Sequence, residues 1–255
     1  MTETAVLLLS SAAIACGFAV VHGFLRFTAG LLRPKGEQKD HHEWANYVIA
    51  STQAAITGSA GAAGLLLEEP FATAFRSVCL FDASVDTVHG HSMVLQTAMP
   101  MILGYFVYDL ALAAFVSGSA MEKLMVVHHS LCIMVWPISF HYRTGCFYIL
   151  YMMAAELSTP FLWLVVYFLP RYKITGPVYI LLGLVMVLVF FVIRILPGPA
   201  LLNSLISSQI YWKGVNPAIY WLAMITLPLP SLLFTYWFVR ILQGMVGALA
   251  SDKKD

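Results

Sequence analysis

The sequence predicts an all-α protein that crosses a membrane several times. Of its 255 residues, 60% are apolar and only 11% are charged. A water-soluble chain of this size with so few charges would expose large apolar patches, whereas a lipid bilayer solvates them. Apolar runs of about 20 residues recur along the chain between polar or turn-rich segments, which is the pattern of transmembrane helices.

We predict about seven such helices. The first run lacks the basic start of a signal peptide, and it is longer than the roughly 7–15 apolar residues of a signal sequence, so it is expected to be a helix of the mature protein. The segments between the runs are expected to be loops, with no separate soluble domain. The predicted spans are 4–32, 45–67, 94–117, 121–140, 145–169, 177–197 and 217–245.

Basic residues predict the orientation of these spans. Eight Lys and Arg residues lie in the first, third and fifth loops and in the tail, and three lie in the other loops. By the positive-inside rule, the N-terminus is expected on the lumenal or external side and the C-terminus in the cytosol. An odd number of spans agrees with this arrangement.

Charge and cysteine content argue against several other classes of function. The net charge is +1 and there is no basic arm, so no nucleic-acid partner is expected. The four cysteines lack metal-ligand spacing, and a disulfide between Cys79 and Cys146 is a minor alternative. The loop histidines would have to converge from opposite sides of the membrane to hold zinc, so we expect neither a metal nor a bound cofactor.

Ionisable residues within the predicted spans are the candidate functional groups. They are Asp109 in the third span, His128 and His129 in the fourth, Glu156 in the fifth and Arg194 in the sixth. A charged side chain at the centre of a membrane helix costs about 2.5–3.5 kcal/mol, so each of these groups needs a partner.

The depth of these residues predicts how they gather. The helical rise places the carboxylates and histidines at comparable depth, which predicts one polar chamber that opens toward the cytosol. Adjacent histidines point about 100° apart on a helix, so the two side chains cannot both be buried on the same face. The alternative is that each group hydrogen-bonds a neighbouring helix and does nothing else. Arg194, near the end of its span, could instead snorkel toward the interface.

Several motifs, taken in order along the chain, resemble the TLC-domain family, which includes the ceramide synthases. Glu156 follows His128 by 28 residues, and ceramide synthases carry a His-His pair followed at this spacing by Asp within "HDxSD". The corresponding stretch here is "AELST", with Ala155 replacing the His and Thr159 the second Asp. "GYFVYDL", "AELSTPF" and "FFVIRI" resemble the less-studied TLC-domain-containing branch. We therefore do not expect a true ceramide synthase.

The resemblance implies a fold and a set of site residues. It implies a TLC domain over 42–245, after a first helix and cytosolic loop (1–41) and before a cytosolic tail (246–255). Six spans would surround a lipid cavity that contains the His pair. The expected catalytic residues are His128, His129, Glu156 and Asp109, and the expected substrate-binding residues are Ser158, Thr159, Arg194 and Tyr105.

The resemblance also suggests an activity, which the residue chemistry permits. A neutral imidazole can attack an acyl-CoA thioester, and a carboxylate can orient the ring and stabilise imidazolium. We expect a protein that binds or acylates membrane lipids in the endoplasmic reticulum, contributes to lipid homeostasis and uses acyl-CoA as co-substrate. The alternative is a non-catalytic lipid-sensing, chaperoning or trafficking protein, with a transporter or channel third. A homo-oligomer is left open.

Overall fold

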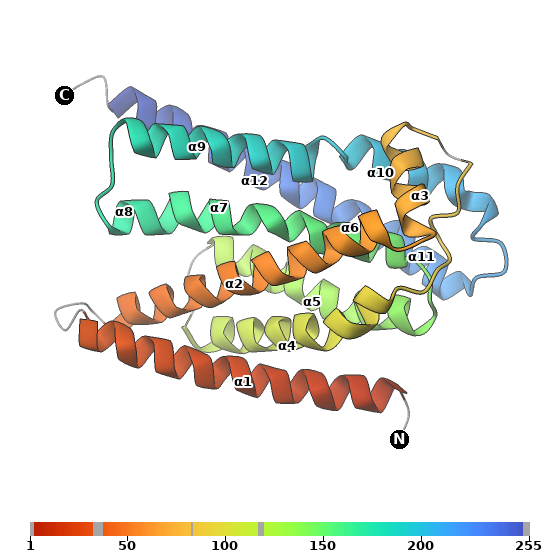
Figure 1. The fold of residues 1–255 in the computed structure, drawn as a ribbon, viewed down its shortest axis with the longest axis horizontal. Helices are drawn as coiled ribbons and strands as arrows, with labels where there is room; N and C mark the ends of the chain where they lie inside the picture. The colour runs from red at the N-terminus through yellow and green to blue at the C-terminus, as the bar shows by residue number, and fades with distance from the viewer. Residues whose placement is uncertain (1–2, 33–37, 83, 117–119, 252–255) are drawn as a thin grey trace.

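The computed structural model describes residues 3–32, 38–82, 84–116 and 120–251, and in these residues the chain is all-α, as predicted. The only β contact in this part of the chain is an isolated bridge between His89 and Thr144. Figure 1 shows long helices lying side by side, with the two termini at opposite ends of the bundle. The placement of the termini agrees with an odd number of crossings.

The first half of the chain forms single long helices and one short helix. These are α1 (Glu3–Leu32), α2 (Gln38–Leu67), α3 (Phe71–Cys79), α4 (Met93–Val116) and α5 (Ala120–His141).

The second half forms three longer runs in which α-helix is interrupted by turns of other helix types. The first run contains α6 (Cys146–Ala155), the 3₁₀ turn η1 (Glu156–Ser158), α7 (Thr159–Trp163), the π-helical turn η2 (Leu164–Phe168) and α8 (Leu169–Arg171). The second contains α9 (Pro177–Phe190), the π-helical turn η3 (Phe191–Ile195), α10 (Gly198–Ser207) and the 3₁₀ turn η4 (Ser208–Ile210). The third contains α11 (Pro217–Thr226) and α12 (Pro228–Ser251).

Six segments of the described chain are long and apolar enough to cross a membrane, which confirms a polytopic membrane protein. The remaining predicted span, 45–67, lies in α2, which has the length of a membrane helix but is rich in Ala, Gly, Ser and Thr, so its hydropathy falls below that of the others. It nevertheless runs through the bundle and packs against α1, α4, α6 and α7 (Figure 1).

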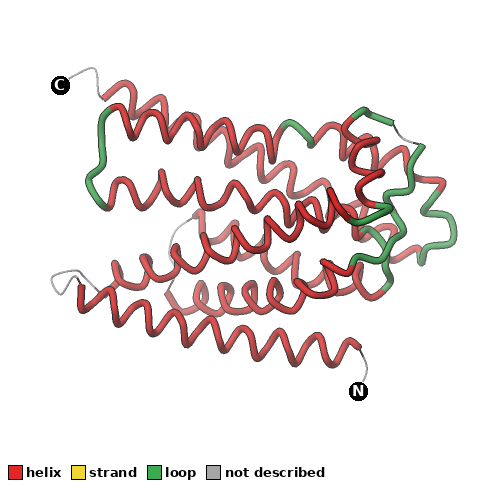
Figure 2. Tube along the Cα trace, in the orientation of Figure 1, coloured by secondary structure: helices red, strands yellow, loops and turns green. Residues whose placement is uncertain are grey.

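Two connections expected to be loops contain helices. The segment after α2 folds into α3, whose Phe71, Ala74 and Val78 are buried. The segment after residue 197 continues as α10, whose Leu201 and Leu205 pack into the main core. Both segments carry apolar residues at helical spacing, so each helix has an apolar face. Burial of this face stabilises a helix that would be too short to be stable in isolation. Figure 2 shows these short helices and most of the loops gathered at one end, called the α3 end below.

The tightest packing in the bundle joins α2 to the run that begins with α6. Phe147, Leu150 and Met153 of α6 are fully buried. A Cβ atom added at Gly58 would lie 2.6 Å from the backbone nitrogen of Leu157, and one at Gly61 would meet the backbone of Ala154. Glycine therefore permits the two helices to touch backbone to backbone, as small residues do at membrane-helix interfaces. This contact positions the start of η1, where the candidate site begins.

Candidate functional site: a His pair beside a membrane-facing cavity

The two adjacent histidines of α5 face different surroundings, as helical geometry requires. His129 is 3% exposed and stacks on Phe106 of α4 with 4.6 Å between ring centroids. His128 is only half-buried and lies on the wall of a cavity. The ring centroids of the pair are 5.5 Å apart. The pair therefore consists of one buried imidazole and one imidazole that a ligand can reach.

Asp109 of α4 is the partner of the buried imidazole. Its Oδ2 lies 2.9 Å from His129 Nδ1, in a close charge contact rather than a straight hydrogen bond. Tyr105, one turn earlier on α4, presents its ring edge to the same imidazole at 5.9 Å. Together with the Phe106 stack, these contacts hold the His129 ring in one orientation. A carboxylate beside Nδ1 favours the tautomer with its proton on that nitrogen.

Glu156 contacts Arg194, whereas the expected role beside the His pair would require a contact with an imidazole. Arg194 Nη2 lies 3.2 Å from Glu156 Oε1, and Arg194 is 5% exposed. Arg194 Nε donates to Ser158 Oγ at 2.7 Å, and Nη2 donates to Thr159 Oγ1 at 2.8 Å. The Thr159 hydroxyl donates to Glu156 Oε2 at 2.8 Å. The snorkelling alternative for Arg194 is therefore wrong: the side chain turns inward and is neutralised there.

Local departures from α-helix allow this network to form. Glu156 and Ser158 lie in the 3₁₀ turn η1, and Arg194 lies in the π-helical turn η3. Each departure changes the angle between successive side chains, so polar groups on otherwise apolar helices turn toward one another. The guanidinium also lies over the rings of Phe234 at 4.5 Å and Phe190 at 5.3 Å, a cation–π arrangement that lowers the cost of burial.

A cavity of about 520 Å³ lies between α5, α6, α11 and α12. This size is typical of sites for small organic ligands. Its walls are mainly apolar, and they include Val127, Leu232 and Tyr236, which are also exposed on the outside of the bundle. The cavity thus opens sideways between α5 and α12, toward the lipid that surrounds a membrane protein. Four elements line it, whereas the resemblance implied six spans.

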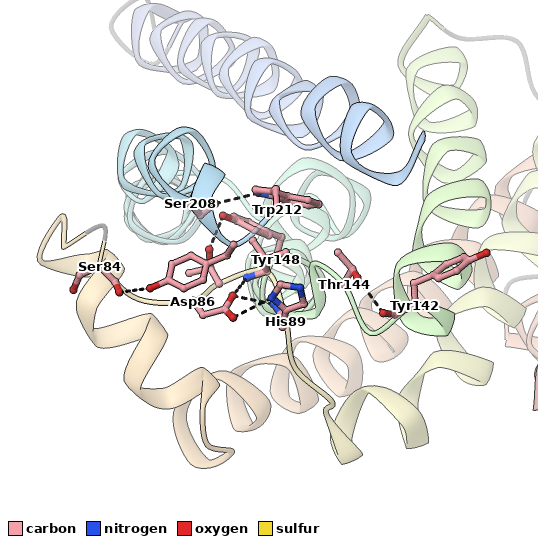
Figure 3. Close-up of polar contacts among 11 residues, drawn as sticks. Ser84, Asp86, His89, Tyr142, Thr144, Tyr148, Ser208 and Trp212 are labelled. Atoms are coloured by element: carbon pink, nitrogen blue, oxygen red, sulfur yellow. Dashed lines mark hydrogen bonds and ion pairs between the residues drawn. The ribbon is translucent and has the colours of Figure 1, made fainter. Parts of the chain in front are cut away.

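The polar groups at the α3 end of the cavity already have partners within the protein. Thr144 Oγ1 donates to the Tyr142 carbonyl at 3.0 Å, and the Trp212 indole nitrogen donates to Ser208 Oγ at 3.2 Å. The Tyr148 hydroxyl lies 3.0 Å from Thr87 Oγ1 and 3.2 Å from Ser204 Oγ. Figure 3 shows Thr144, Tyr148 and Trp212 gathered there with Asp86 and His89, which hydrogen-bond each other.

The expected single chamber is therefore divided into three parts. Asp109 with His129 forms one pair, Glu156 with Arg194, Ser158 and Thr159 forms a second cluster, and among these residues only His128 lines the cavity. The cavity opens to the side of the bundle, where its lining residues Val127 and Leu232 are exposed. The sequence gives the position of a residue along its helix, and hence its depth in the membrane. It does not give the direction in which the side chain points within the bundle.

Sequence reasoning missed a polar cluster involving α1. His22 Nε2 lies 3.0 Å from His42 Nδ1 of α2, and His22 Nδ1 lies 2.6 Å from the Tyr108 hydroxyl of α4. His42, at the start of α2, thus has a partner on α1. The signal that could have found this cluster is His22 itself, an ionisable residue inside the first span that needs a partner there.

Metal binding finds no support in the part of the chain that the structure describes. No group of three or more His, Cys, Asp or Glu side chains in these residues is arranged to hold a metal ion. All four cysteines are free, so the Cys79–Cys146 disulfide does not form in this structure.

The geometry defines a polytopic α-helical membrane protein with an intramembrane His pair beside a cavity. The family model for the TLC domain matches residues 43–243, and the chain belongs to this family, which confirms the resemblance. The chain is similar to TLC domain-containing protein 4 of Xenopus tropicalis, 24% identical over 210 residues that cover 79% of this chain and 74% of that protein. It is also similar to TLC domain-containing protein 4-A of Xenopus laevis, 24% identical over 208 residues, with 79% and 75% covered. No solved structure matches.

Proposed function

We propose that the protein binds the acyl chain of a membrane lipid in the cavity and transfers an acyl group through His128. The observation that carries this proposal is the accessible imidazole on the wall of an apolar cavity that opens to the bilayer. An apolar, laterally open cavity favours a lipid tail over a water-soluble substrate, because the tail can enter without leaving hydrocarbon.

The chemistry follows from the imidazole. A neutral ring nitrogen of His128 attacks the thioester carbonyl of acyl-CoA, the carbon–sulfur bond breaks, and the CoA thiolate leaves and takes up a proton. The acyl-imidazole then reacts with an amine or hydroxyl of an acceptor lipid, and the acceptor's proton passes to the His128 ring nitrogen as the carbon–nitrogen bond breaks, which restores the neutral imidazole. His129, which Asp109 contacts, lies next to His128 with 5.5 Å between their ring centroids.

A second candidate is lipid binding without catalysis. One observation favours it: both intramembrane carboxylates are engaged elsewhere, Asp109 with His129 and Glu156 with Arg194. His128 forms no hydrogen bond or close ion pair with a carboxylate among the described residues, and a catalytic imidazole usually has such a partner.

One experiment separates the two candidates. The purified protein in lipid nanodiscs is incubated with a long-chain acyl-CoA, and its intact mass is measured. The catalytic proposal expects an added acyl mass that is lost in His128→Ala and retained in His141→Ala, the matched control at the exposed end of the same helix. Labelling of the cavity by a photoactivatable fatty acid without any acyl adduct would favour the non-catalytic candidate. Absence of both would contradict the proposed function.

We further propose that the protein resides in the endoplasmic reticulum with its N-terminus in the lumen. The distribution of Lys and Arg supports the orientation, and the implied role in acylation of membrane lipids supports the location. Insertion of glycosylation sites near residue 80 and at the C-terminus tests the orientation. Modification of the tail alone would reverse it.

A further inference from the structure

The wall of the cavity carries a thiol that the proposed acyl transfer does not use. Cys132 of α5 lines the cavity, is 5% exposed and is a free cysteine. Of the four cysteines, all of which lie in the described part of the chain, only Cys132 lines this cavity. A buried thiol is inert toward reagents in water, so its chemistry depends on what the cavity brings to it.

Cys132 and His128 form a pair of nucleophiles on the same face of α5, one turn apart. The residues of α5 that line the cavity run from Leu124 to Ser139 at helical spacing, and Cys132 lies in the middle of this stripe. Side chains four residues apart on a helix have their Cβ atoms about 5–6 Å from each other. The thiol and the accessible imidazole therefore face the same space and can reach the same acyl carbon.

The position of Cys132 is deeper in the bundle than that of His128. Val127, one residue before His128, is exposed on the outside, whereas Val135 and Trp136, beyond Cys132, are buried. A step from His128 to Cys132 moves an acyl group about 6 Å along α5 at 1.5 Å per residue, into the buried part of the cavity wall. Exclusion of water from that part protects an acyl group from hydrolysis.

We propose that Cys132 accepts the acyl group from His128 and holds it as a thioester inside the cavity. This inference rests on the proposed function, because His128 must first take the acyl group from acyl-CoA. The Cys132 sulfur attacks the carbonyl of the acyl-imidazole, a carbon–sulfur bond forms, and the carbon–nitrogen bond to His128 breaks. The thiol proton passes to the His128 ring nitrogen, which restores the neutral imidazole.

The overall reaction exchanges one thioester for another. Acyl-CoA and the Cys132 thiol become acyl-Cys132 and the CoA thiol, so the step needs no oxidant, reductant or further co-reactant. An acyl-imidazole is a more reactive acyl donor than a thioester, so transfer from His128 to the thiol is favourable. The thioester then holds the acyl group until an acceptor lipid enters the cavity.

The test locates the acyl group in the full-length protein in lipid nanodiscs. The protein is incubated with a long-chain acyl-CoA, its intact mass is measured at once and again after an interval in neutral buffer, and the adduct is mapped to a peptide. Cys132→Ala removes the thiol. Cys146→Ala is the matched control, because Cys146 is also buried and free but does not line the cavity.

The expected result is selective for one cysteine. In the wild type, the adduct should persist in neutral buffer, map to the peptide that contains Cys132 and be released by neutral hydroxylamine, as thioesters are. Cys132→Ala should lose the persistent adduct and keep only a short-lived one on His128, because acyl-imidazoles hydrolyse in water. Cys146→Ala should behave as the wild type. His128→Ala should lose both adducts, since the thiol receives its acyl group through the imidazole.

Cys132→Ser provides a second variant of nearly the same shape in case alanine disturbs packing. An oxyester resists neutral hydroxylamine, whereas a thioester does not. Loss of the persistent adduct in Cys132→Ser, or its conversion to a hydroxylamine-resistant form at the same position, would support the inference.

The outcomes separate this inference from the proposed function. A persistent, hydroxylamine-sensitive adduct of undiminished amount in both Cys132 variants would overturn the role of Cys132 and leave acyl transfer through His128 intact. Acylation of Cys132 at the wild-type rate in His128→Ala would overturn the transfer between the two residues. Absence of any adduct in the wild type, even at the earliest time, would overturn both this inference and the proposed function.

Discussion

The Arg194 network and the His128–Trp237 pair lie in neighbouring parts of the membrane-spanning region and differ in how their polar groups are satisfied. Arg194, Glu156, Ser158 and Thr159 bond one another, and both carboxylate oxygens are used. Trp237 Nε1 is buried without a hydrogen-bond partner among the described residues, and His128 contacts the rings of His129 and Trp237. Trp237 and Ala155, the residue before Glu156, share one apolar cluster, so the indole packs between the two regions. A satisfied polar network stabilises a fold, whereas an imidazole on the wall of a cavity remains available to a ligand.

The largest effect is expected from breaking the Arg194 network. Arg194→Met removes the cation and leaves the Glu156 carboxylate without its charged partner inside the bundle. Loss of one partner of a buried ion pair costs about 3–5 kcal/mol, so most of the protein should aggregate on extraction. Size-exclusion chromatography in detergent and thermal unfolding measure this loss.

The matched control for this prediction is the double variant Glu156→Met with Arg194→Met. Replacement of a buried pair by apolar residues is often neutral, so the double variant should recover much of the folded yield. A single Arg194→Met variant as stable as the wild type would show that the network does not contribute to the fold.

A smaller effect is expected from the Asp109–His129 contact. Asp109→Asn keeps the shape of the side chain and removes its charge, so the imidazole loses its carboxylate contact while its stack on Phe106 remains. Polar contacts between membrane helices are worth about 1–2 kcal/mol in model peptides, and a modest fall in unfolding temperature should follow. A fall as large as that of Arg194→Met would mean that this contact, and not the Arg194 network, is the main polar support.

The smallest effect on stability is expected at the accessible imidazole. His128→Ala removes a ring with no hydrogen-bond partner among the described residues, so the free energy of unfolding should change by less than about 1 kcal/mol. Acyl-adduct formation should be lost nevertheless. The comparison would fail if His128→Ala lowered stability as much as Asp109→Asn, because the two histidines would then be equally structural.

Much of the fold could be predicted from sequence because a bilayer enforces it. Apolar runs of the right length must become helices, since backbone groups in hydrocarbon have to hydrogen-bond internally. The weakest prediction was α2, whose small residues give a poor hydropathy signal although they permit its close contact with the run beginning at α6. The segments around Phe71 and Leu201 were expected to be loops because short amphipathic helices are stabilised by burial, which sequence does not display.

The sequence predicted which residues belong to the candidate site, but not which of them contact one another. The sequence showed that the side chains of His128 and His129 must diverge, and it named Asp109, Glu156 and Arg194 as groups that need partners. It could not assign the partners. Glu156 and Arg194 meet across 38 residues through a 3₁₀ turn and a π-helical turn, and neither turn leaves a clear sequence pattern.

What the sequence alone determined is the solvent, the class of fold and the polar residues that need partners, because composition, helical period and the cost of charge in hydrocarbon are properties of local chain segments. Only the tertiary structure decided which imidazole reaches a ligand, which carboxylate pairs with which cation, and where the cavity opens. These depend on the rotation of each helix about its axis. That rotation is set by packing against distant segments, such as the glycines of α2 against the Leu150–Leu157 stretch of its neighbour.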